Sequence, residues 1–85
     1  MHNIATIVPF KLLEGYRVGF NSGDEHEQLH VRVLRGGSEA KIWIDPVSLQ
    51  HNHGYNEREL KRVLELVLRY QAELLEMWRE HFGQP

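Results

Sequence analysis

The spacing of the hydrophobic residues changes once along the chain, and this change constrains the fold more than any other feature. Up to about Asp45, apolar and polar residues tend to alternate, which is typical of strands with one buried face. From Asn56 to Phe82 the apolar residues recur every three to four positions, which predicts an amphipathic helix. We therefore expect an α+β fold: a small antiparallel sheet of three to four strands within residues 4–45, a connecting loop over residues 46–55, and one long C-terminal helix over residues 56–82 packed against the sheet.

The best-defined strand pair is a hairpin in the middle of the chain. The runs His30–Arg35 and Ala40–Ile44 flank Gly36, Gly37 and Ser38, a sequence that favours a tight turn. Alternation predicts that these two strands share one buried face, made of Val31, Val33, Ala40, Ile42 and Ile44. We expect the following Pro46 to end the sheet, because proline has no N–H to donate to a neighbouring strand.

Three signals mark the start of the helix. Asn56 can accept a hydrogen bond as the N-cap, and Glu59 stands three residues later, as in a capping box. Tyr55 and Leu60 occupy the positions of a hydrophobic staple. We expect the helix to cover the sheet with one apolar stripe, formed by Leu60, Leu64, Val67, Leu74, Trp78 and Phe82.

Composition restricts the class of protein. The 85 residues include no cysteine, which excludes a disulfide framework and a thiolate metal site. The formal net charge of −2 does not suit a globally basic nucleic-acid binder, although a local basic surface remains compatible with it. The chain has neither the features of a signal peptide nor an apolar run long enough to span a bilayer, and no linker separates two apolar regions. We expect a single cytoplasmic domain, residues 1–85, without a membrane segment.

Six short motifs, taken together, resemble a known family. They are Tyr16-Arg17, Glu27 to Val33, Ala40 to Pro46, Asn52-His53-Gly54, Arg58-Glu59-Leu60 and Trp78 to Gly83. On this set, which covers about residues 16–83, the chain is identified as a member of domain of unknown function family 4160. The family commonly has Pro-Pro-His-Val-His-Val in its third strand; here His30 matches the first histidine and Arg32 replaces the second.

The resemblance implies a compact sheet-plus-helix fold and a bacterial cytoplasmic protein. It also implies genetic pairing with another small family, of the kind seen in toxin–antitoxin-like operons. It implies no established activity. Our leading hypothesis is therefore an interaction protein, a non-enzymatic component of a two-gene module that binds either a small co-encoded protein or a second copy of itself.

A second hypothesis concerns the outer face of the sheet. Strand alternation places basic groups and one indole opposite the buried face, and these residues form a candidate binding face: Arg17, His30, Arg32, Lys41 and Trp43. Basic groups neutralise phosphates and an indole stacks on bases, so this face predicts binding of single-stranded RNA. The alternative is an ordinary solvated face in which the segment after Pro46 covers Trp43.

The sequence supports neither a metal site nor a catalytic site. His51 and His53 lie close together but lack a third ligand at metal-binding spacing, so we expect no metal and no cofactor. A third hypothesis, an RNA-cleaving toxin with His30 or His53 as general acid or base, lacks a second catalytic group. The roles of these three histidines stay open.

The length of the helix predicts association. About 27 helical residues extend roughly 40 Å, whereas short strands span only about 17–20 Å. Leu66, Tyr70 and Met77 lie together beside the main stripe, and we expect this flank to form an interface in a homodimer or with another protein. The alternatives are that the segment Ile4 to Leu13 covers the flank, or that the helix bends to follow the sheet. Gln71, within the main stripe, needs a hydrogen-bond partner if it is buried.

Overall fold

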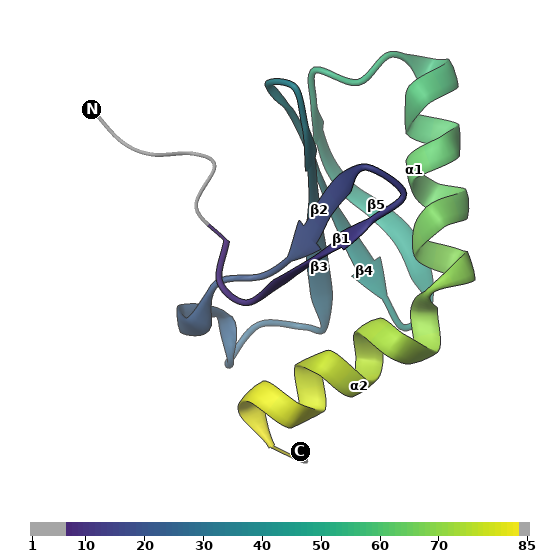
Figure 1. The fold of residues 1–85 in the computed structure, drawn as a ribbon. Helices are drawn as coiled ribbons and strands as arrows, with labels where there is room; N and C mark the ends of the chain where they lie inside the picture. Colours follow the sequence, from purple (N-terminus) through teal and green to yellow (C-terminus); the bar gives the residue numbers. More distant parts are fainter. Residues whose placement is uncertain (1–6, 84–85) are drawn as a thin grey trace.

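The computed structural model describes residues 7–83 as a five-stranded antiparallel sheet with two helices packed on one of its faces (Figure 1). Each strand pairs with the next one along the chain, in the order β1-β2-β3-β4-β5. The elements are β1 Phe10–Leu13, β2 Tyr16–Gly19, the 3-10 helix η1 Ser22–Asp24, β3 His30–Arg35, β4 Ser38–Ile44, β5 Val47–His53, α1 Glu57–Arg69 and α2 Gln71–Phe82. The α+β class and the antiparallel sheet are thus confirmed. Residues 4–6 of the expected sheet lie outside the described residues.

The sheet has five strands, so the expectation of three to four was wrong. The missed strand is β5, in the segment that was expected to be a loop, and it pairs with β4 from Val47 to His53. Asp45 and Pro46 form the tight turn between the two strands instead of ending the sheet. β5 could not be recognised from its sequence because it is the last strand of the sheet and mostly exposed. It therefore needs no alternation of apolar and polar residues.

The core lies between the sheet and the helices, as the alternation of apolar and polar residues along the strands predicted. The predicted inward residues of β3 and β4 are fully buried, as are Val63 and Val67 of α1 and Leu74 of α2. Trp78 of α2 packs against Phe20, with ring centroids 4.8 Å apart. One hydrophobic cluster joins these residues, so sheet and helices stabilise one another through a shared core.

The helix begins where its cap predicted. The side-chain oxygen of Asn56 accepts a hydrogen bond from the backbone N–H of Glu59 at 2.8 Å. The loop before it is held by Asn52, whose amide donates to the Tyr55 carbonyl at 2.9 Å and accepts from the Tyr55 N–H at 3.2 Å. The Tyr55 hydroxyl in turn donates to the carbonyl of Val33 at 2.9 Å. Burial and the neighbouring Tyr16 raise the pKa of Tyr55 to about 12.

The expectation of one long helix was wrong, because the helix breaks at Tyr70, where φ is −104° and ψ is 16°. The chain changes direction there, and α2 turns across the end of the sheet (Figure 1). A straight helix of this length would extend roughly 40 Å, which exceeds the 34 Å maximum extent of the fold. The amide of Gln71 donates to the carbonyl of Ile44 at 2.8 Å, and this bond fixes the bend against the end of β4.

Candidate functional site on the open face of the sheet

The face of the sheet that is turned away from the helices is here called the open face. The strand register aligns its side chains in rows that run across the strands. One row consists of Leu12, Arg17, Leu34, Glu39 and His53. The next row consists of Phe10, Gly19, Arg32, Lys41 and His51. The open face is therefore apolar along β1 and charged across the middle of the sheet.

Four of the five residues of the predicted binding face lie together here. Arg17 is exposed, whereas Arg32, Lys41 and Trp43 are half-buried. The ammonium group of Lys41 lies 5.5 Å from the centre of the Trp43 indole. Trp43 pairs across the strands with Ser48 of β5, and it keeps partial exposure on this face.

Carboxylates neutralise two of the basic groups of the open face. Arg32 Nη1 lies 2.8 Å from Glu39 Oε2, and Lys41 Nζ lies 2.7 Å from Glu27 Oε1. Within residues 7–83, the buried Nε of Arg32 makes no hydrogen bond. The face is therefore less basic than its strand pattern indicated. Glu39 was not expected on this face because its strand was predicted to begin at Ala40, and Glu27 was not expected because its polar loop was predicted to be solvent-exposed.

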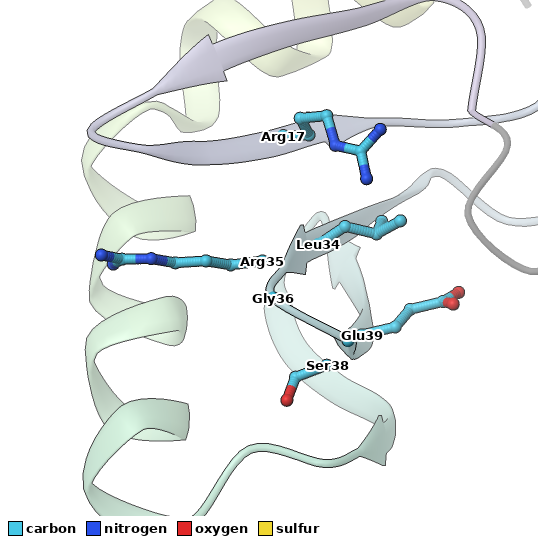
Figure 2. Close-up of a pocket in the computed structure, with 7 residues that line it drawn as sticks. Arg17, Leu34, Arg35, Gly36, Ser38 and Glu39 are labelled. Atoms are coloured by element: carbon cyan, nitrogen blue, oxygen red, sulfur yellow. The ribbon is translucent and has the colours of Figure 1, made fainter.

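Arg17 lines a hollow of about 200 Å³ beside the β3–β4 hairpin. Figure 2 shows Arg17, Leu34 and Glu39 directed to the side away from α1, whereas Arg35 extends toward α1. The guanidinium carbon of Arg35 lies 4.9 Å from the centre of the Tyr16 ring. Of the arginines in this hollow, Arg17 thus belongs to the open face and Arg35 to the helical side.

His30, the fifth residue of the predicted face, is fully buried and is not part of the accessible surface. Its Nδ1 lies 2.9 Å from the carbonyl oxygen of Gln28, and its Nε2 lies 2.9 Å from Oδ2 of Asp24. The imidazole also packs edge-on against Trp43 and Trp78, at centroid distances of 6.1 and 5.3 Å. Alternation assigned His30 to the outer face, but the η1 segment and α2 close over this end of the sheet.

Asp24, Glu27 and His30 bring three potential metal-ligand atoms within 4.8 Å of one another. Each atom is already engaged by the protein: Nε2 by Asp24, Nδ1 by the Gln28 carbonyl, and Glu27 Oε1 by Lys41. Asp24 Oδ2 also accepts from the N–H of Asn21 at 3.1 Å. The donor set fits a hydrogen-bonded structural cluster better than a cation site. Asp24 could not be recognised as a partner of His30 from the sequence, because it lies in a polar loop.

An exposed apolar strip consists of Val8, just before β1, and of Phe10 and Leu12 on the open face of β1, with exposed fractions of 60%, 48% and 69%. Gly19 of β2 lets this segment approach closely, because a Cβ atom there would lie 2.1 Å from the Pro9 carbonyl oxygen. The sequence did not reveal the strip, since apolar residues occur at both alternating sets of positions in this segment and do not indicate which face is covered.

The flank of Leu66, Tyr70 and Met77 is not an exposed apolar patch. Leu66 and Met77 are buried in the core, with exposed fractions of 2% and 7%. Tyr70 is half-buried, and its hydroxyl donates to Oε2 of Glu14 at 3.1 Å. This hydrogen bond is the main cause that raises the pKa of Tyr70. The premise of the interface prediction was wrong because the helix bends at Tyr70 and turns Met77 inward.

Three further histidines lie outside the cluster around His30. His51 and His53 are exposed on β5, and they fall in different rows of the open face. His81 of α2 packs edge-on against Phe20 at 5.7 Å. In the part of the chain that the structure describes, these histidines do not converge on one centre.

Several motifs that carry the family resemblance therefore have structural roles: Asn52 holds the loop before α1, Trp78 belongs to the core, and His30 joins η1 to β3. Neither α1 nor α2 is long and apolar enough to cross a membrane. No curated protein and no solved structure matches the chain. Residues 15–79 match the family model described as Domain of unknown function (DUF4160), and the chain therefore belongs to this family.

Proposed function

We propose that the protein is a non-enzymatic binding component of a bacterial, cytoplasmic two-gene module of the toxin–antitoxin type, and that it acts by binding a partner protein through the open face of the sheet. The observation that carries this proposal is the exposed apolar strip of Val8, Phe10 and Leu12. Apolar side chains that are grouped on a protein surface commonly mark a contact with another protein. The partner is the small protein encoded beside this one.

The strip has the geometry of a docking edge. β1 is the first strand of the sheet, so one side of its backbone is free of the other four strands. An extended segment of a partner can pair with such an edge while apolar side chains fill the spaces between Phe10 and Leu12. Arg17 stands beside Leu12 in the same row and can pair with a carboxylate at the rim of the contact.

The chemistry of the described residues favours binding over catalysis. His30, the histidine that the family resemblance emphasised, is buried, and both ring nitrogens are hydrogen-bonded. General acid–base catalysis requires a group within reach of a substrate proton, and His30 is closed off from any substrate. This arrangement argues against the RNA-cleaving toxin with His30 as the catalytic group.

The test is binding of the purified neighbouring gene product by isothermal titration calorimetry. Leu12→Glu places a charge at the most exposed residue of the strip and is expected to raise the dissociation constant at least about tenfold. Leu68→Glu is the matched control, because Leu68 is similarly exposed, at 58%, but lies on α1. Equal affinities for Leu12→Glu and the unaltered protein, or no binding of the neighbouring product at all, would contradict the proposal.

RNA binding is the second candidate function, and the observation that favours it is the pairing of Lys41 with the half-exposed Trp43 on the open face. Single-stranded RNA at low salt is then expected to quench the fluorescence of Trp43, because bases stack on exposed indoles. Trp43→Phe separates this signal from that of the buried Trp78. Lys41→Glu and Arg32→Glu should abolish the quenching. Fluorescence that does not respond to RNA would eliminate this candidate.

A further inference from the structure

A second surface lies on the opposite side of the molecule from β1. It combines the outer edge of β5 with a leucine stripe on α1, formed by Leu60, Leu64 and Leu68. α1 packs over β4 and β5, so the helix and the edge strand are neighbours. We call this surface the β5 flank.

The residues on the opposite flank of α1 show toward which side of the molecule the leucine stripe faces. There, Arg69 bonds Glu14 in the turn between β1 and β2, at 3.0 Å, and Arg62 and Leu66 line the same small hollow. Successive residues of a helix are about 100° apart, which places Leu60, Leu64 and Leu68 on the flank of α1 opposite to Arg62 and Leu66. The stripe therefore faces the β5 side of the molecule.

The stripe is an open apolar surface on the flank of α1, and no other element of the described chain lines it. Leu60 and Leu64 are half-buried, and Leu68 is 58% exposed. Glu57, Lys61 and Glu65 border the stripe, so the charges beside it alternate along the helix. Leucines spaced four residues apart form the kind of ridge with which two helices pack.

The edge of β5 is suited to pairing with another strand. It has seven residues, without proline, lysine or any carboxylate. Natural proteins usually protect such edges with charge, proline or short length, because the free backbone groups attract another strand. Leu49 of β5 is 40% exposed, which adds apolar surface at this edge.

We propose that a second copy of this chain docks on the β5 flank. A two-fold axis would pair β5 with β5 in antiparallel fashion, extend the sheet across both copies, and bring the two leucine stripes together on the same face of the sheet. A two-fold contact needs a surface that is complementary to itself.

The midpoints of β5 and α1 lie at the same level along the strand direction. A single two-fold axis can therefore relate both the two β5 strands and the two α1 helices. At one end of β5, Asn52 bonds Tyr55, next to the start of α1. At the other end, Val47 pairs with Ile44, whose carbonyl accepts from Gln71 just after α1. The centre of β5 is Gln50, and the centre of α1 is Val63.

The charged residues of α1 are placed so that this two-fold axis brings opposite charges together. Lys61 precedes Val63 by two residues and Glu65 follows it by two, so Lys61 of each copy lies level with Glu65 of the other across antiparallel helices. Leu64 lies next to the axis, in the middle of the stripe. The leucines would supply the apolar centre of the contact and these ion pairs its rim.

The test is the molecular mass of the purified protein by light scattering after size exclusion. The chain weighs 10.0 kDa, so the expected mass is about twice that value and falls toward it on dilution. Leu68→Glu is expected to raise the dissociation constant of the dimer at least about tenfold. Lys61→Glu should weaken the dimer, and the charge swap Lys61→Glu with Glu65→Lys should restore it. Leu12→Glu, on the other edge of the sheet, is the matched control and should leave the mass unchanged.

Circular dichroism of each variant shows whether the fold is retained. A monomer mass for the unaltered protein at several hundred micromolar, a dimer that Leu68→Glu does not weaken, or a dimer that Leu12→Glu disrupts would each overturn the proposal. The result is independent of the neighbouring gene product, so the failure of one proposal leaves the other intact.

Discussion

Asp24→Asn is a direct test of the buried pair that joins η1 to β3. In the structure, Oδ2 of Asp24 accepts from the N–H of Asn21 at 3.1 Å and lies 2.9 Å from Nε2 of His30. The other ring nitrogen, Nδ1, lies 2.9 Å from the Gln28 carbonyl oxygen, which can only accept, so Nδ1 carries a proton. A second proton must then lie between Nε2 and Asp24, as an imidazolium paired with a carboxylate or as a carboxylic acid paired with a neutral imidazole.

Asparagine fits the space but cannot make both bonds with a neutral histidine. If its oxygen takes the place of Oδ2, it accepts from Asn21, but His30 must then keep a charge that no buried carboxylate balances, since Glu27 is 44% exposed. If its amino group takes that place, it donates to His30 but faces the N–H of Asn21. Each orientation leaves one buried polar group without its partner, and we expect a loss of about 1–3 kcal/mol in the free energy of unfolding.

The measurement is urea denaturation at pH 7, with Glu27→Gln as the matched control. Glu27 is the other carboxylate near this imidazole, 3.9 Å from Nδ1, but its side chain is 44% exposed. Its loss should change the unfolding free energy by less than about 1 kcal/mol, because exposed ion pairs contribute little. Equal stabilities for Asp24→Asn and Glu27→Gln would refute the reasoning, since burial is what distinguishes the two sites.

Three further changes test the fold. Asn56→Ala removes the cap of α1 and should lower stability by about 0.5–2 kcal/mol, whereas Asn56→Asp should not, as thermal unfolding of the two variants will show. Gly19→Ala places a Cβ atom against Pro9 and should cost about 1–3 kcal/mol, whereas Gly23→Ala, with nothing within 4 Å of its added Cβ, should be tolerated. The pKa of Tyr55 is raised to about 12, so folding retains a proton that the unfolded chain releases near its ordinary value of 10.0, and stability should fall as pH rises through this interval. Denaturation at several pH values should show a smaller fall for Tyr55→Phe, and an identical fall would contradict the assignment.

Much of the central fold could be predicted from the sequence because it depends on local patterns. The β3–β4 hairpin combines two alternating runs with a glycine turn, and its inward residues Val31 and Ile42 are fully buried as expected. The N-cap at Asn56 is equally local, since its hydrogen bond reaches only three residues along the chain. It could also be predicted that Gln71 needs a hydrogen-bond partner, but the sequence did not indicate that this partner is the Ile44 carbonyl.

The accessible surface depended on contacts between distant parts of the chain. Lys41 was correctly placed on the outer side of its strand, but its neutralisation by Glu27 of a separate loop could not be read from either segment. His30 followed the same alternation and is nevertheless buried, because η1 and α2 close over it. The leucine stripe on α1 became distinct from the core-facing residues only when the position of the sheet beneath the helix was known.

The sequence by itself therefore determined the α+β class, the central hairpin with its buried face, and the start of the helix, because each depends on hydrophobic period or capping within a few residues. Only the tertiary structure decided that Val47–His53 is a strand, because an exposed edge strand acquires its conformation by pairing with a neighbour and not from its own pattern. It also decided that the helix breaks at Tyr70, where Gln71 bonds the end of β4 and Trp78 turns inward to the core. Burial against a distant partner outweighs helix propensity at such a position, since propensity differs by at most about 0.7 kcal/mol among ordinary residues.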